Sequence, residues 1–107
     1  MSDAAATPFY DTLETRAPAE REAALMAALP RQVAHAQART GAFAQLLAGV
    51  DAAAVTSRAA LARLPVTRKG ELLEQQKAAR ASDPFGGFSA IGWRALGKPA
   101  ARRVYQS

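Results

Sequence analysis

The residues that could carry out chemistry are few in this 107-residue sequence, and they stand apart from one another. His35 is the only histidine, and no neighbouring motif supplies the nucleophile and orienting acid that a general base needs. The nine carboxylates are scattered, without the paired spacing of a glycosidase or a two-metal site. The absence of cysteine excludes disulfides, thiolate metal sites and cysteine nucleophiles. We therefore predict no catalytic, cofactor-binding or metal-ligating residue in this chain.

Two other features resemble parts of known sites but are better explained by local structure. None of the serines at positions 57, 82, 89 and 107 lies in a Gly-x-Ser-x-Gly elbow, and Ser57 is well placed to cap a helix. Gly86 and Gly87 could suggest a phosphate-binding loop. However, they lie between Phe85 and Phe88, and no Lys-Ser or Lys-Thr follows them. We predict a tight turn there.

The charge is unevenly distributed along the chain. Residues 1–57 hold four arginines and six acids, a net charge of −2, whereas residues 58–107 hold ten basic residues and three acids, a net charge of +7. The dispersed basic residues favour a solvated face. Nucleic-acid binding is the alternative, because basic residues and aromatics are mixed near the C-terminus: Trp93, Arg94, Lys98, Arg102, Arg103 and Tyr105. No ribonucleoprotein motif or helix-turn-helix pattern accompanies them.

The apolar content predicts a thin hydrophobic core. Half of the residues are hydrophobic, but 28 of these 53 are alanine, which removes little apolar surface from water. Such a chain is expected to lean on another domain or on a second copy. No signal peptide or bilayer-spanning apolar run is recognisable, so we expect a cytoplasmic protein and no membrane partner.

The spacing of apolar residues predicts a mainly α fold. After a tail at residues 1–10, Asp11 and Glu14 have capping-box spacing and predict a helical turn at residues 11–15. Pro18 suits a helix start, and the apolar steps continue across Pro30, which favours one kinked helix over residues 18–39 rather than two helices. Thr40 and Gly41 predict its end.

Three shorter helices are expected after this end. The first carries Phe43, Leu46, Leu47 and Val50 on one side, and a turn follows over residues 49–54. Ser57 caps a second helix over residues 58–63, with Leu61 and Leu64 facing inward. Thr67 caps a third helix over residues 68–81, which places its apolar positions at Leu72 and Leu73 and pairs Glu74 with Lys77 on its surface.

The pattern changes at Asp83. The composition of residues 83–88, with Pro and Gly between bulky aromatics, predicts a turn. Ile91, Trp93 and residues 103–107 are compatible with short strands. The expected organisation is a tail (1–10), a helical part (11–82) and an irregular, β-prone stretch (83–107). Because a strand beginning at the end of this sequence could not pair within it, we expect residues 1–107 to be one segment of a larger protein.

Several motifs occur in an order that resembles the opening of phenylacetate–CoA ligases. These are YDTLE at residues 10–14, L-x-x-x-V-A-H-A at 29–36, AF at 42–43, LARLPVTRK at 61–69 with Leu72 following, PFGGF at 84–88 and VYQS at 104–107. The match to the family pattern L-x-x-L-P-x-T-x-K-x-x-L is the most specific of them. The stretch 92–101 departs from the family pattern. The resemblance covers residues 10–107, about the first quarter of a family member.

The resemblance implies an adenylating enzyme that activates an aryl or related carboxylate with ATP and Mg²⁺ and transfers it to CoA. The phosphate loop, the nucleotide contacts and the mobile C-terminal domain of the family come later than these motifs, so no catalytic residue transfers to this chain. We expect the 107-residue chain alone to be inactive. The alternative is a stand-alone helical interaction module, either a homodimer or bound to a larger partner, that buries the side of the long helix bearing Leu25, Leu29 and Val33.

Overall fold

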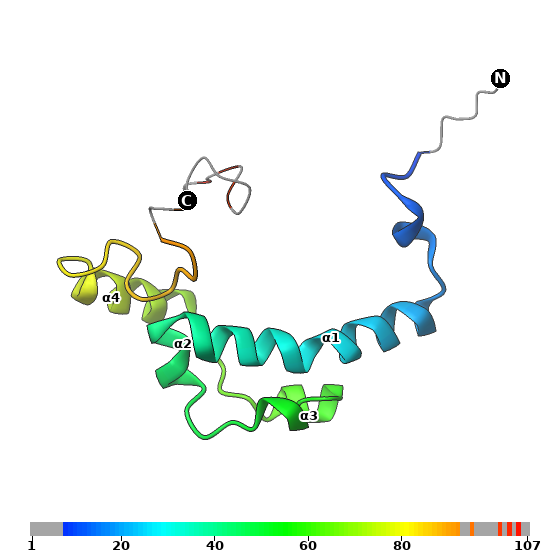
Figure 1. The fold of residues 1–107 in the computed structure, drawn as a ribbon, viewed down its shortest axis with the longest axis horizontal. Coiled ribbons are helices and arrows are strands. Elements are labelled where there is room, and N and C mark those ends of the chain that lie inside the picture. The colour runs from blue at the N-terminus through cyan, green and yellow to red at the C-terminus, as the bar shows by residue number, and fades with distance from the viewer. Residues whose placement is uncertain (1–7, 93–94, 96–100, 102, 104, 106–107) are drawn as a thin grey trace.

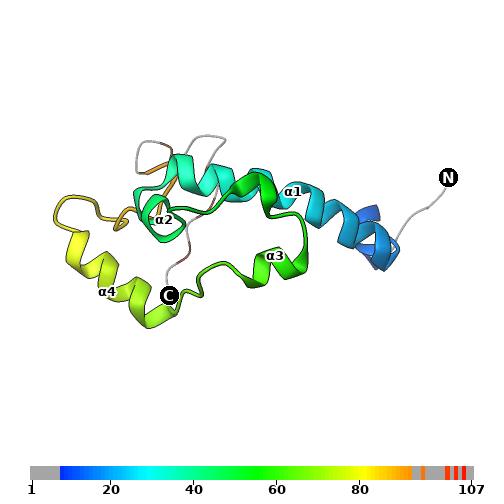
Figure 2. The same cartoon turned by 90° about the horizontal axis from the view of Figure 1, so that it is seen from below.

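The computed structural model describes residues 8–92, 95, 101, 103 and 105. The fold is mainly α, as predicted, and within these residues it contains four α-helices and two 3₁₀ turns (Figure 1). In chain order they are η1 (Thr12–Thr15), α1 (Pro18–Arg39), α2 (Gly41–Leu46), η2 (Ala52–Ala54), α3 (Arg58–Ala62) and α4 (Lys69–Ala79). The long helix α1 packs against α2 and η2 at its C-terminal end, and α3 lies alongside it (Figures 1 and 2).

The start of the helical part follows its local signals, with one difference. Asp11 caps η1 as predicted, its Oδ1 accepting from Leu13 N at 2.9 Å. Glu14 does not close a capping box on Asp11; its carboxylate accepts instead from the backbone N–H of Tyr10. Pro18 opens α1, and the helix runs unbroken through Pro30 to Arg39, so the interpretation as one helix is confirmed.

Thr40 ends α1 and begins α2 with the same side chain. Its Oγ1 donates to the carbonyl of Ala36 at 2.9 Å and accepts from Phe43 N at 3.1 Å. The prediction that Gly41 lies beyond a helix end is therefore incomplete, because Gly41 is the first residue of α2. Thr40 is also the one buried polar residue among those described, and its hydroxyl has both a donor and an acceptor partner.

The core is small, as the composition predicted. Val33, Leu47 and Val55 are the buried apolar residues within the described part of the chain. Seven half-buried residues pack on them: Leu29, Ala36, Phe43, Val50, Ala52, Ala60 and Leu64. The side-chain amide of Gln37 adds two hydrogen bonds, with Nε2 donating to the carbonyls of Leu47 at 3.0 Å and Val50 at 2.9 Å. The core therefore lies at the C-terminal end of α1.

The later helices show two corrections to the sequence predictions. Ser57 caps α3 as expected, accepting from Ala60 N at 3.1 Å, and Leu64 packs on the core, but Leu61 is 39% exposed and does not face inward. Thr67 does not cap α4: Arg68 holds the cap position and makes no side-chain capping bond. Three residues without regular secondary structure (66–68) thus separate Pro65 from α4, one more than a cap at Thr67 predicted.

Helix α4 ends two residues earlier than predicted. Its Leu72 is half-buried and its Leu73 is 46% exposed, and Glu74 pairs with Lys77 at 3.6 Å as expected. Beyond it, residues 83–88 form turns, and Ile91 lies in a bend rather than in a strand. Arg103 and Tyr105 have no regular secondary structure. Trp93 and the other residues of the expected strands (104, 106 and 107) lie outside the described residues.

Candidate functional site: an apolar groove beside Phe43

The residue types that carry chemistry remain separated in space. His35 is exposed on α1. Within the described residues, no three His, Cys, Asp or Glu side chains come together in a way that could hold a metal ion. Ser57 is engaged as a helix cap, and the hydroxyl of Ser82 donates to the carbonyl of Ala79 at 3.0 Å. Ser89 accepts from the N–H groups of residues 91 and 92. These hydroxyls serve local turns.

The Gly86–Gly87 turn is built around its own carboxylate. Asp83 Oδ1 accepts from Phe85 N at 2.9 Å, its Oδ2 accepts from Gly87 N at 3.0 Å, and its carbonyl accepts from Gly86 N at 2.8 Å. Three N–H groups of the turn are therefore already bound, two of them to the negatively charged carboxylate. This arrangement does not favour a bound phosphate, and it agrees with the prediction of a tight turn.

The turn at residues 83–88 joins α4 to α2. The carbonyl of Gly87 accepts from Ala42 N at 3.0 Å, and the ring of Phe88 meets that of Phe43 edge to face, with centroids 5.7 Å apart at 78°. On the α4 side, Gln76 Nε2 donates to the carbonyl of Pro84 at 3.2 Å. Residues far apart in the sequence thus converge on Phe43.

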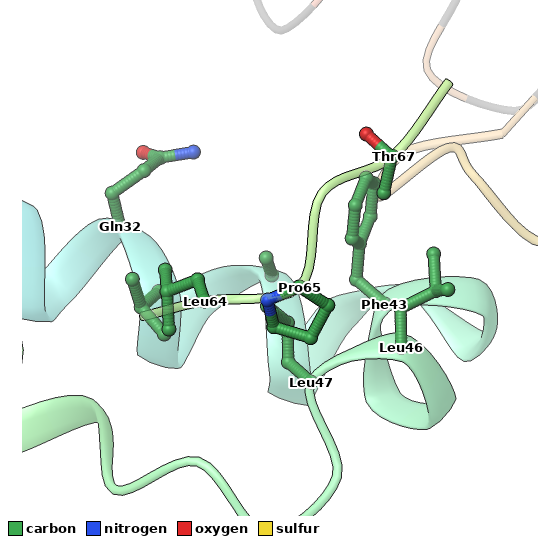
Figure 3. Close-up of a pocket in the computed structure, with 9 residues that line it drawn as sticks. Gln32, Phe43, Leu46, Leu47, Leu64, Pro65 and Thr67 are labelled. Atoms are coloured by element: carbon green, nitrogen blue, oxygen red, sulfur yellow. The ribbon is translucent and has the colours of Figure 1, made fainter. Parts of the chain in front are cut away.

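Phe43 also lines an apolar groove of about 320 Å³. Figure 3 shows Gln32 on α1 at one end, Phe43 and Leu46 on α2, and the segment between α3 and α4 crossing the groove. Only two of the nine lining residues carry polar side chains. The lining consists of Gln32, Val33, Ala36, Phe43, Leu46, Leu47, Leu64, Pro65 and Thr67. Such a surface suits an apolar side chain of a partner rather than a charged ligand.

Basic residues flank the segments that line this groove. Arg31 precedes Gln32, and Arg63 precedes Leu64, while Arg68 and Lys69 follow Thr67. All four side chains are exposed, and none takes part in an ion pair within the described part of the chain. The nearest acid in the sequence is Glu71, on the first turn of α4. The lining of the groove is therefore apolar, and four exposed basic residues lie next to lining residues in the sequence.

One ion pair ties the other half of α1 to α3. Arg58 donates to both carboxylate oxygens of Glu22, with Nε–Oε2 at 2.5 Å and Nη2–Oε1 at 2.7 Å. This hydrogen bonding, together with the arginine's charge, holds the pKa of Glu22 below its ordinary value, and the pKa of Arg58 is raised in turn. Both groups are accessible to solvent, so salt weakens the pair.

Sequence reasoning identified the apolar residues of the groove but not the groove itself. Phe43, Leu46 and Leu47 were expected on one side of a helix. No local sequence pattern predicts that Pro65 and Thr67 line the same groove. Trp93, Arg94, Lys98 and Arg102, which raised the alternative of nucleic-acid binding, lie outside the described residues. None of the helices in the described ranges combines the length and the apolar character needed to cross a membrane.

Comparison of the chain with protein-family models, with curated proteins and with solved structures gave no match.

Proposed function

We propose that this chain is the N-terminal helical segment of a phenylacetate–CoA ligase-like enzyme. The enzyme would activate an aryl or related carboxylate as an acyl-adenylate and transfer the acyl group to CoA. ATP, Mg²⁺ and CoA would be bound by parts of the enzyme beyond these motifs, in the cytoplasm. The segment itself would contribute a scaffold and no catalytic group.

The observation that carries the proposal is the meeting of the resemblance motifs around one side chain. Phe43 belongs to the AF motif at residues 42–43. It contacts Phe88 of the PFGGF motif, and it shares the groove with Leu64, Pro65 and Thr67 of the LARLPVTRK motif. Gln32, Val33 and Ala36 of the motif at residues 29–36 also line the groove. Segments about 45 residues apart in the sequence therefore pack together, which supports treating the motifs as parts of one structural unit.

The experiment has two steps. An antibody raised against the 107-residue chain would first identify the native antigen in the source cells, and a band several-fold heavier than 11.3 kDa is expected. That protein, purified, would then be assayed for pyrophosphate release with ATP, Mg²⁺ and a panel of aryl and related carboxylates, followed by acyl transfer to CoA. The 107-residue chain is the matched control and should show no turnover.

Two results would overturn the proposal. The first is a native antigen at the mass of this chain alone, which would make it an independent small protein. The second is a larger antigen that forms no acyl-adenylate with any acid of the panel. Turnover by the 107-residue chain itself would contradict the assignment of catalysis to the rest of the enzyme.

A further inference from the structure

A short segment before the N-terminal end of α1 differs in composition from the groove beside Phe43. Residues 9–14 present large side chains to solvent: Phe9 is 52% exposed, Tyr10 92% and Leu13 55%. Asp11 and Glu14 lie among them, and no basic residue does. The segment is thus apolar and acidic, whereas the groove has an apolar lining whose neighbours in the sequence are basic.

The charges of the two regions are complementary. Residues 9–20 carry Asp11, Glu14 and Glu20 against one arginine at position 16, a net charge of −2. Next to the residues that line the groove, the sequence carries Arg31, Arg63, Arg68 and Lys69 against Glu71, a net charge of +3. Asp11 uses Oδ1 to cap η1, which leaves Oδ2 able to accept from an arginine. Opposite charges in the two regions favour docking in one orientation.

The segment cannot reach the groove of its own chain. Helix α1 runs unbroken between them, and the fifteen residue steps from Pro18 to Val33 span about 22 Å at 1.5 Å per step. Figure 1 shows η1 beside the N-terminal end of α1 and the groove-forming elements at the other end. An occupant with the composition of residues 9–14 therefore has to come from another molecule.

We propose that residues 9–14 of a second copy of this chain dock in the groove, so that two copies form a reciprocal dimer. A two-fold axis would run two α1 helices antiparallel and repeat the same contact at both ends, as in isologous dimers. The middle of such a pair lies near Leu25. This residue is 50% exposed and shares a side of α1 with Gln32, seven positions on. The apolar surface would then continue from one groove to the other. This inference does not depend on the catalytic assignment proposed above.

Disulfide trapping tests the contact directly, because the native sequence contains no cysteine. Chains carrying Leu13→Cys are mixed with chains carrying Thr67→Cys under mild oxidation, and a mixed disulfide dimer is expected. The control mixture replaces Thr67→Cys with Ala81→Cys, at an exposed position just beyond α4. Equal trapping in both mixtures, or trapping in neither, would overturn the proposed contact.

Sedimentation equilibrium over a dilution series gives the second test. Leu13→Ser should weaken dimerisation by about tenfold or more, as expected for an anchor side chain. Leu73→Ser, at a leucine of α4 that is 46% exposed, should leave dimerisation unchanged. No residue of η1 is buried, so the fold of each copy should survive, which circular dichroism would verify.

Charge reversal separates docking from loss of folding. Asp11→Lys with Glu14→Lys should weaken the dimer, and so should Arg63→Glu with Arg68→Glu, whereas all four changes in one chain should restore it. A monomer at every concentration, or a dimer that none of these changes affects, rejects the proposal. A dimer weakened by both pairs but not restored by their combination rejects the pairing of these two surfaces.

Discussion

The two halves of α1 form the same helix but have different surroundings. The C-terminal half carries buried Val33, half-buried Ala36 and Gln37, whose amide binds two carbonyls of the α2 region. The N-terminal half carries Leu25 at 50% exposure, and in the described chain its one ion pair to another element is Glu22–Arg58. The helix is therefore continuous along its whole length, although its C-terminal half has more tertiary contacts than its N-terminal half. Its stability should decrease along α1 from the C-terminal to the N-terminal end.

The same substitution at two leucines should give the largest contrast between these regions. Leu47→Ala leaves a cavity against Val33 and should cost about 2–5 kcal/mol of unfolding free energy, enough to unfold much of a marginal domain. Leu25→Ala should change it by less than about 0.5 kcal/mol. Urea unfolding, followed by circular dichroism at the lowest workable concentration, would measure both. Equal losses would show that the halves are equally fixed.

Two glycines with positive φ give a smaller contrast. A Cβ at Gly86 would lie 2.6 Å from the Cα of Gln76, at φ +64°, so Gly86→Ala must separate the turn from α4 and should cost about 2 kcal/mol. Gly49, at φ +81°, has nothing within 4 Å of an added Cβ, and Gly49→Ala should cost about 1 kcal/mol. The urea midpoints give the order. In Gly86→Ala, altered Phe43 and Phe88 ring resonances would locate the change, and a larger loss from Gly49→Ala would contradict this account.

The Glu22–Arg58 pair should give the smallest effect, and it depends on pH. Because Arg58 lowers the pKa of folded Glu22, the pair contributes stability above the unfolded pKa, and this contribution is lost as pH falls through the lower folded value. The urea midpoint of Glu22→Gln should therefore fall less than that of the native chain between about pH 5 and pH 3. Glu71→Gln is the control. The difference should shrink at about 1 M salt, and its persistence there would argue against an exposed pair.

Much of the helical layout could be predicted because its signals are local. Pro18 fixed the start of α1, the apolar period carried it through Pro30, and the side chains of Asp11 and Ser57 capped the turns assigned to them. The wrong predictions came from residues whose type or spacing is compatible with more than one local structure. Thr67 has the residue type of a cap but stands too early, and Leu61 has apolar spacing in a helix too short to bury it.

The groove could not be predicted because contacts between distant residues form it. The carbonyl of Gly87 meets Ala42 N, and the ring of Phe88 meets that of Phe43, across about 45 positions of sequence. No spacing rule anticipates such a pair. Gln37 likewise reads as an ordinary polar helix residue, and its two bonds depend on where the chain returns after α2.

Pro30 lies near the boundary between the two halves of α1, and this position has a consequence for hydrogen exchange. The residue has no amide proton, so the carbonyl of Met26 lacks its partner four residues ahead. Unwinding that begins at the N-terminus of α1 can proceed to this gap without breaking a bond of the next turn. The amides before Pro30 should then exchange with solvent as one fast group, and those of residues 33–40 as a slow one. The proline thus divides one continuous helix into two units of opening.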